Sequence, residues 1–469
     1  MNRYRYLGKN IGILTLSNFA SKFLTFILVP IYTTYLSTEE YGQFDFVQTT
    51  INLLLPIITL NIAESVLRFL LEEQEDTETV ISIGIKWTVI GIAIICVASV
   101  INVYFHLLAV IENYSIFFIL IFITLSMSTI LINTARGLDK LVHLAISSVL
   151  ATVGMLGSCI MFLCVFHWGL SGYFLSNLIG PLIQSIYLFF ALEFWNYIKW
   201  RKINLYKEKK MLLYSCPLIV NSIAWWINSV SDRYVVIWFC GFSVSGIYAV
   251  ASKIPGILNV FQSIFNQAWT LSAVKDFDKD DKNGFFSTMY NSYNALMVTL
   301  CSLLVLLDKP IAKLLYAKEF YEGWKYAPFL MMGIIFGAIS GYIGGIFSAV
   351  KDSKEFAKST AIGAIANILM NIILVPLIGA MGAAIATAVS YWMVYCLRIT
   401  KAKKYINMRT NLSRDNFTYI LIVAQIIALL NTEGFKMYII QSVICAAILL
   451  LYYREFSHVI KNFPKRCKR

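Results

Sequence analysis

Charged side chains inside long apolar runs are the residues of this sequence best placed to do chemistry. Asp232 and Arg233 lie in the apolar run 211–240, and Lys253 lies in the run 244–272. A charge near the centre of a bilayer costs about 3 kcal/mol on insertion scales, so it usually faces a cavity or a partner. We therefore expect these three side chains to bind an ion or an anionic group.

Basic side chains within or near the apolar runs form the first candidate site. A phosphate or diphosphate suits them, because its charge compensates theirs. Two alternatives stay open: lysines can extend their ammonium groups towards water, and Glu64 can pair with Arg68 across one helical turn. The candidate substrate-binding residues are Lys22, Arg68, Lys86, Arg233 and Lys253.

Oxygen-bearing side chains form a second candidate site. Asn367 and Asn371 share one face of a helix, and Thr387 follows in the next run. With Asp232, these residues lie about 9–15 Å from the outer ends of their helices, at 1.5 Å per residue. Together with the Ala383 carbonyl they could form an oxygen cage for Na⁺, and Asp232 could carry H⁺ instead. Alternatively, Asp232 pairs with a neighbouring cation and the asparagines join helices.

The elements that position these residues are membrane-spanning helices. Hydrophobic residues make up 58% of the 469 residues and charged residues 14%, and the mean hydropathy is +0.69. About 14 apolar runs are long enough to cross a hydrocarbon core of about 30 Å, which predicts an all-α polytopic membrane protein. The expected spans are 10–36, 41–71, 80–105, 113–135, 140–166, 170–198, 211–240, 244–272, 284–307, 325–350, 354–377, 379–400, 416–431 and 436–453.

Basic loops predict the orientation of these helices. Lys199–Lys210, Arg398–Arg414 and the C-terminal tail carry many basic residues, which places them and both termini in the cytoplasm. The net charge of +13 is then an orientation signal, and we expect no nucleic-acid partner. Because the loops are short and hold no catalytic cluster, we do not expect an enzyme or a cofactor beyond a coupling ion.

An internal repeat predicts how the helices are grouped. Gly42 and Gly246 follow similar positions at an offset of 204 residues, and Gly169 and Gly379 at an offset of 210. An even number of spans per repeat gives two parallel six-helix lobes, an arrangement typical of alternating access. The expected domains are an N-terminal lobe (1–198), a basic linker (199–210), a C-terminal lobe (211–400) and two extra helices with a basic tail (401–469).

Several segments resemble one known family. The sequence is similar to the polysaccharide flippases (Wzx-like, O-antigen and capsule repeat-unit translocases) of the MATE-like MOP superfamily. This resemblance implies a substrate of undecaprenyl-diphosphate-linked oligosaccharide. It implies transfer from the inner to the outer leaflet of a bacterial plasma membrane, ahead of a polysaccharide polymerase. The resembling segments are 30–42, Glu64–Phe69, Arg136–Lys140, Ser231–Val235 and Gly246–Pro255.

The related lipid II flippases, which the sequence also resembles, imply residue roles. Their cavity arginines suggest that Lys22 and Lys253 contact substrate. Their sodium site suggests the same role for Asp232, Asn367, Asn371 and Thr387. Asn371 departs from that pattern, because an acid is expected there, and this leaves Na⁺ or H⁺ as the coupling ion. A multidrug cation antiporter and a membrane enzyme of polysaccharide assembly are the alternative functions.

Overall fold

The computed structural model describes residues 24–72, 76–275, 277–350 and 352–457. In these residues the chain forms helices joined by turns and no strand, which confirms the predicted all-α class. The chain divides into two compact units, Met1–Val230 and Ser231–Arg469. This division lies inside one long helix, whereas the sequence places a linker at 199–210. The predicted lobe bounds stay a prediction.

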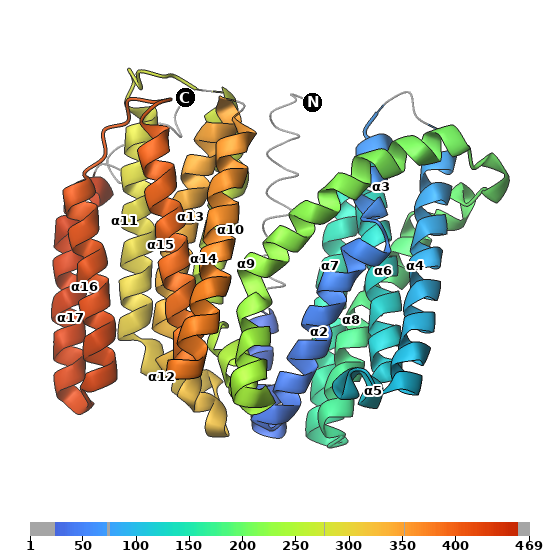
Figure 1. The fold of residues 1–469 in the computed structure, drawn as a ribbon, viewed down its shortest axis with the longest axis horizontal. Helices are drawn as coiled ribbons and strands as arrows, with labels where there is room; N and C mark the ends of the chain where they lie inside the picture. Colours follow the sequence, from blue (N-terminus) through green and yellow to red (C-terminus); the bar gives the residue numbers. More distant parts are fainter. Residues whose placement is uncertain (1–23, 73–75, 276, 351, 458–469) are drawn as a thin grey trace. The chain divides into compact units, whose positions relative to one another are not determined.

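Unit 1 is a bundle of helices, and several of them run from one end of the unit to the other (Figure 1). A short apolar helix, Leu24–Tyr35, precedes them. The numbered helices are α2 (Thr38–Ile58), α3 (Ile62–Leu70), α4 (Thr77–Phe105), α5 (Ala109–Asn113), α6 (Ser115–Gly137), α7 (Leu141–Cys159) and α8 (Gly169–Ala191). A π-helical turn, Ile160–Val165, extends α7, and the 3₁₀ turns Phe194–Tyr197 and Trp200–Lys202 follow α8.

The expected span 41–71 is two helices rather than one. Ser37 begins α2 with a capping box, in which its hydroxyl accepts from the Glu40 amide and the Glu40 carboxylate accepts from the Ser37 amide. Leu60 and Asn61 then adopt left-handed φ angles of 52° and 50°. This conformation is uncommon for residues other than glycine, so the sequence does not signal it. The two helices, α2 and α3, meet at 58°.

The core of unit 1 joins α3, α4 and α6. Val66, Val80 and Ile130 are fully or almost fully buried in one cluster. Gly84 permits this close packing, because a Cβ atom there would lie 2.5 Å from a Val66 methyl group. Glycine at this point of α4 therefore lets three helices meet without a gap.

The long helix α9 (Leu205–Ala251) contains a reversal that the sequence predicts. Gly241 has a φ of 83° and a ψ of 174°, so two helical stretches meet there. A positive φ costs glycine little, which explains glycine at this position. A break at Ser252–Pro255 separates α9 from α10 (Gly256–Lys275), since Pro255 has no amide hydrogen to continue the helix.

Unit 2 begins in α9 and holds the remaining helices. After α10 come α11 (Phe285–Leu306), α12 (Asp308–Leu315) and a 3₁₀ segment, Lys318–Lys325. The last five helices are α13 (Ala327–Ala349), α14 (Ser353–Ile378), α15 (Ala380–Ala402), α16 (Leu412–Asn431) and α17 (Gly434–Leu451).

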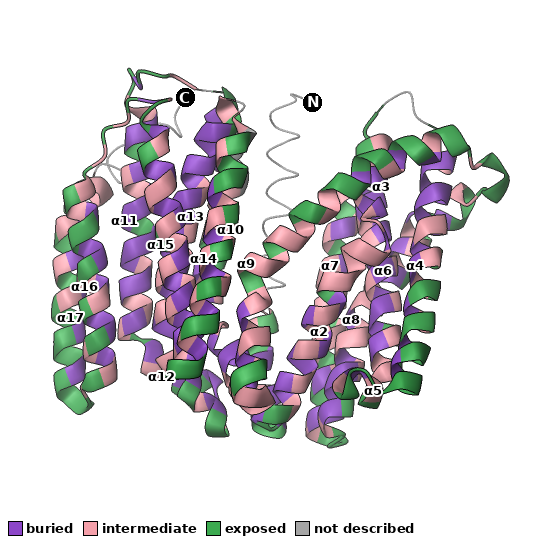
Figure 2. Cartoon of the chain, viewed as in Figure 1, coloured by how far each residue is buried: buried purple, intermediate pink, exposed green. Residues whose placement is uncertain are grey.

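Helix α13 forms the centre of unit 2. In its most apolar stretch 72% of the residues are buried, compared with 50% for α15 and 22% for α17, and Figure 2 shows α17 mostly exposed. Gly345 of α13 receives the Trp269 indole of α10, whose Nε1 donates to the Tyr342 carbonyl at 2.7 Å. Small residues thus let large aromatic side chains pack against the α13 backbone.

Polar side chains attach the C-terminal helices α16 and α17 to α11. Gln425 accepts from the Ser302 hydroxyl at 2.9 Å and donates to the Ser302 carbonyl at 3.0 Å. Gln441 of α17 donates to the Gln425 carbonyl at 2.8 Å. All three side chains are buried, so these hydrogen bonds fix the extra helix pair on unit 2.

The described helices account for most of the predicted spans. By length and composition, 11 helices can cross a membrane, or 12 when the bent pair α2 and α3 is one span. The expected span 10–36 lies partly outside the described residues. The expected span 244–272 is divided by the break at Ser252–Pro255. The predicted count of about 14 is therefore not established, although the fold class is.

Candidate functional site

The carboxylate of Asp232 lies at the centre of a buried polar cluster in unit 2. Its Oδ2 accepts from the Tyr248 hydroxyl at 2.6 Å and from the Thr387 hydroxyl at 3.4 Å. Its Oδ1 accepts from the Arg233 amide at 3.0 Å. Asp232 is only 7% exposed, so these donors replace the water that an exposed carboxylate would bind.

Two asparagines of α14 continue the cluster. Asn367 donates to the Thr387 hydroxyl at 3.3 Å and to the Ser390 hydroxyl at 3.2 Å. Asn371 donates to the Asn367 side-chain oxygen at 3.0 Å. The Asn371 oxygen Oδ1 is buried and accepts no hydrogen bond from the described residues. A chain of hydrogen bonds therefore joins all four predicted side chains of the ion site.

Local sequence explains why α14 and α15 approach so closely here. Gly379 has a φ of 63° and turns the chain between the two helices. At Gly382 a Cβ atom would lie 2.5 Å from the Leu374 carbonyl oxygen, so only glycine fits without a shift. The fifth predicted residue, Ala383, is fully buried and packs in one apolar cluster with Tyr248. The close approach places the face with Asn367 against the face with Thr387.

The oxygen atoms of this cluster suit a hard cation or a proton. Carboxylate, amide and hydroxyl oxygens are the ligands that Na⁺-like and other hard cations prefer. Among the described residues no group of three or more His, Cys, Asp or Glu side chains could hold a transition metal. The Asn371 Oδ1, which accepts no hydrogen bond from the described residues, is suited to be a cation ligand. Which residues bind the ion, and which ion it is, stay predictions.

Sequence reasoning missed Tyr248 and Ser390. Tyr248 makes the shortest hydrogen bond to Asp232, yet its sequence position indicates only an aromatic packing residue. A signal was available, because Asp232 precedes the Gly241 reversal by nine residues and Tyr248 follows it by seven. Residues at similar distances from a hairpin turn lie at similar depths, so the pair could have been expected.

The predicted cation positions lie in different surroundings. Lys22 lies outside the described residues. Lys253 lies in the break between α9 and α10 rather than in a continuous helix, which corrects the expected span 244–272. Its side chain is half-buried and forms no ion pair among the described residues. The Arg233 guanidinium lies 3.5 Å from the Ser252 hydroxyl, so both of the predicted substrate-binding cations in unit 2 adjoin this break.

The two cations of unit 1 have carboxylate partners. Arg68 pairs with Glu72 at 2.9 Å, and no ion pair joins it to Glu64 in the described part of the chain. The Lys86 ammonium pairs with Glu208 of α9 at 2.8 Å. The Trp87 indole also donates to the Glu208 carboxylate at 2.8 Å. These acids neutralise both cations, and a paired cation attracts an anionic substrate less strongly. A substrate-binding role for Arg68 and Lys86 stays a prediction.

A family comparison identifies the chain. The polysaccharide biosynthesis protein family matches residues 7–271, which is more than half of the 469 residues. The chain belongs to this family. The match covers unit 1 from residue 7 onward, the α9 reversal and most of α10, so it includes Asp232 and Lys253. No curated protein is significantly similar to the chain in sequence.

Solved structures of MOP-superfamily transporters share the fold of this polysaccharide biosynthesis protein. The lipid II flippase MurJ, in an inward closed conformation, aligns with a TM-score of 0.71 at 16% identity, over 96% of this chain and 99% of MurJ. An inward-facing multidrug resistance MATE family transporter aligns with a TM-score of 0.63 at 13% identity, over 90% and 96%. Both neighbours are membrane transporters and not enzymes. The chain is a multi-pass membrane protein with this transporter fold.

Proposed function

We propose that the protein is a flippase for polyprenyl-diphosphate-linked oligosaccharide repeat units, which it moves from the inner to the outer leaflet of a bacterial plasma membrane. The observation that carries this proposal is the match to the polysaccharide biosynthesis family on a chain with the fold of a lipid II flippase. Both termini would lie in the cytoplasm, and a polysaccharide polymerase would use the product.

Lys253 and Arg233 would bind the diphosphate. Both adjoin the break at Ser252–Pro255, where the chain is not helical. Discontinuous helices often hold the substrate sites of transporters. A lysine is a compact point charge and binds phosphate without the fixed geometry of an arginine. We expect Lys22 and Lys253 to receive the diphosphate while the prenyl chain stays in lipid.

Asp232, Asn367, Asn371 and Thr387 would bind the coupling ion, with the Ala383 carbonyl as a further oxygen. A bound Na⁺ would supply a positive charge that compensates the buried carboxylate. A proton on Asp232 would achieve the same compensation. Binding and release of this charge would change the relative stability of the two transport states, since a ligand shifts an equilibrium only by its differential affinity. Alternating access would follow from that shift.

A multidrug cation antiporter is the second candidate, because a MATE transporter shares the fold. Cationic drugs would require acidic side chains along the path. The basic residues near the break at Ser252–Pro255 favour an anionic substrate instead. Drug resistance conferred by expression of the chain, without any effect on surface glycan, would favour the antiporter.

Lys253 variants test the proposed function in cells. In a strain that lacks its own repeat-unit flippase, we expect the wild-type protein to restore surface glycan. Lys253→Ala should abolish this activity, while Lys253→Arg should retain much of it, because the positive charge remains. Membrane insertion of each variant is the control. Full glycan with Lys253→Ala at equal protein level would contradict the role of Lys253.

A further inference from the structure

The first turns of α9 and the 3₁₀ turn before them expose basic and apolar side chains together. Lys199, Arg201, Lys209 and Lys210 are exposed and form no ion pair among the described residues. Leu205 and Leu213 are also exposed, at 79% and 66%. We call residues 199–217 the basic segment. Basic and apolar side chains on one exposed helix are typical of segments that lie on a membrane surface.

The basic segment contains one acidic residue, Glu208, which is paired with a lysine of α4. Glu208 is buried, and its carboxylate accepts from the Lys86 ammonium and the Trp87 indole of α4. These two contacts fix the inner face of α9 against unit 1. Glu78 of α4 pairs with Lys202 of the segment at 2.7 Å. The two acids are thus paired with Lys86 and Lys202, and Lys199, Arg201, Lys209 and Lys210 keep a positive charge on the exposed side of the segment.

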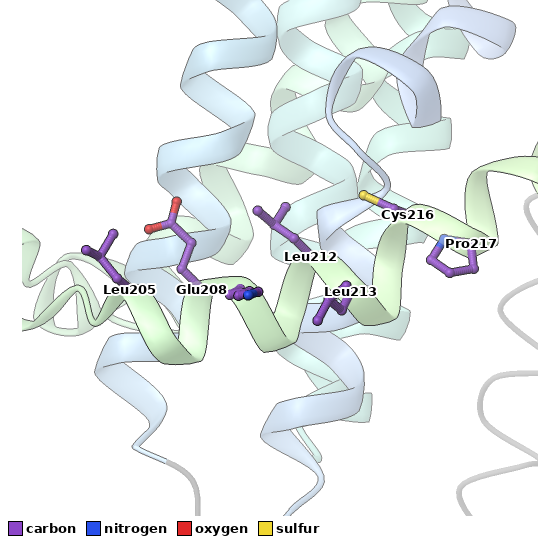
Figure 3. Close-up of a pocket in the computed structure, with 7 residues that line it drawn as sticks. Leu205, Glu208, Leu212, Leu213, Cys216 and Pro217 are labelled. Carbon is purple, nitrogen blue, oxygen red and sulfur yellow. The ribbon is translucent and has the colours of Figure 1, made fainter.

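A shallow apolar groove runs along the same part of α9. Its volume is about 460 Å³, and Leu205, Leu212, Leu213, Cys216 and Pro217 form most of its lining. Figure 3 shows these side chains along successive turns of the helix. The remaining lining residues are Glu208, whose carboxylate is paired with Lys86, and Lys209, whose positive charge borders the apolar surface.

We infer that the basic segment binds an anionic phospholipid of the leaflet that it faces. The phosphate would contact Lys209 and Lys210, with Lys199 and Arg201 adding attraction from the preceding turn. An acyl chain would lie in the groove beside Leu213. Charge complementarity selects this occupant, because clusters of lysine and arginine beside a membrane attract anionic lipids. This inference concerns lipid attachment and does not depend on which substrate the protein transports.

The position of the segment gives the lipid a structural effect. Figure 1 shows the first part of α9 crossing over the ends of unit 1 helices, near α3 and α4, instead of running parallel to them. Glu208 holds this stretch on the protein side, and a lipid would hold it on the opposite side. An anionic lipid would therefore stabilise the bent course of α9 that precedes Pro217.

Lipid retention by the full-length protein tests this inference. Native mass spectrometry would compare phosphatidylglycerol with phosphatidylcholine of the same acyl chains. We expect the wild-type protein to retain phosphatidylglycerol preferentially. The combined variant K199Q/R201Q/K209Q/K210Q should lower this retention by roughly tenfold or more, since each basic residue near an anionic surface contributes substantially.

Matched variants separate the effect of the basic segment on lipid retention from the effect of positive charge elsewhere on the protein. The variant K354Q/K358Q/K403Q/K404Q removes four exposed lysines of unit 2 and should retain phosphatidylglycerol like the wild type. If the first variant does not fold, the double variant K209Q/K210Q replaces it, and K209R/K210R should restore retention.

Three results would overturn the inference. The first is equal retention of the two lipids by the wild-type protein. The second is an equal loss of retention in both quadruple variants. The third is a dimer that disappears in the first variant, because a second copy of the chain would then occupy the surface.

Discussion

Asp232→Asn tests the buried ion site while preserving the shape of the side chain. The wild-type protein should gain about 2.7 kcal/mol of unfolding free energy at a Na⁺ concentration 100 times the dissociation constant. In the wild-type protein the Tyr248 hydroxyl donates to the Asp232 carboxylate at 2.6 Å. Asparagine still offers an oxygen to this hydroxyl, but it has no negative charge to compensate a cation. We therefore expect this variant to gain nothing from Na⁺ and to be no less stable without it.

Tyr248→Phe separates support of the carboxylate from ion binding. Hydrogen bonds to charged groups contribute about 1.5–3 kcal/mol. Among the described residues, loss of the hydroxyl leaves the buried carboxylate with the Thr387 hydroxyl and the Arg233 amide as its donors. We expect the unfolding free energy to fall by about 1.5–3 kcal/mol, while the response to Na⁺ is retained.

The assay is thermal unfolding of the purified protein in NaCl and in choline chloride at equal ionic strength, repeated over a pH series. If H⁺ is the coupling ion, the wild-type response follows pH instead of Na⁺ and is again lost in Asp232→Asn. Asp308→Asn is the matched control, because Asp308 is a fully buried acid of α12 in the same unit. Equal Na⁺ and pH responses in Asp232→Asn and wild type would refute the ion site.

Three further variants, with Glu72→Gln as a control for the first, test contacts that stabilise the two units. Glu208→Gln should lower the unfolding free energy by about 1–3 kcal/mol. This loss is smaller than that expected for breaking a fully buried ion pair, because the Lys86 side chain is 33% exposed. Glu72→Gln, which breaks an exposed ion pair, should cost about 0–1 kcal/mol. Asp76→Ala should lower stability by about 1 kcal/mol at neutral pH, as expected for loss of a helix N-cap. The Thr79 hydroxyl lowers the Asp76 pKa, so this stabilisation is present above about pH 4 and disappears as the pH falls through the lowered value. Gly382→Ala should cost about 1–3 kcal/mol and weaken the Na⁺ response, because its Cβ would meet the Leu374 carbonyl. Thermal unfolding measures all three effects, and a change in Asp76→Ala that is independent of pH would contradict the capping account.

Residue type and spacing predicted the helical class and four side chains of the cluster around Asp232. Gly241 and Gly379 marked the turns, since both adopt positive φ angles that glycine tolerates. The four-residue spacing of Asn367 and Asn371 indicated one helix face. These features depend on local sequence and helical periodicity, so they can be predicted from the sequence itself.

Other features depend on contacts between distant segments. Glu208 lies 122 residues from Lys86, and nothing in the local sequence connects them. The bend between α2 and α3 arises at Leu60 and Asn61, where tertiary packing imposes a conformation that neither residue type requires. The span 244–272 was expected to be continuous, and the sequence did not show that Lys253 lies in a break of the helix.

The most direct test of the central claim is leaflet-resolved transport by the purified protein in vesicles. A polyprenyl-diphosphate-linked oligosaccharide would be placed in one leaflet, and its arrival in the other leaflet would be followed with a membrane-impermeant reagent. The account predicts transport by the wild-type protein and background rates with Lys253→Ala. Background rates with the wild-type protein, at equal reconstitution and with a repeat unit from its own biosynthetic pathway, would contradict the account.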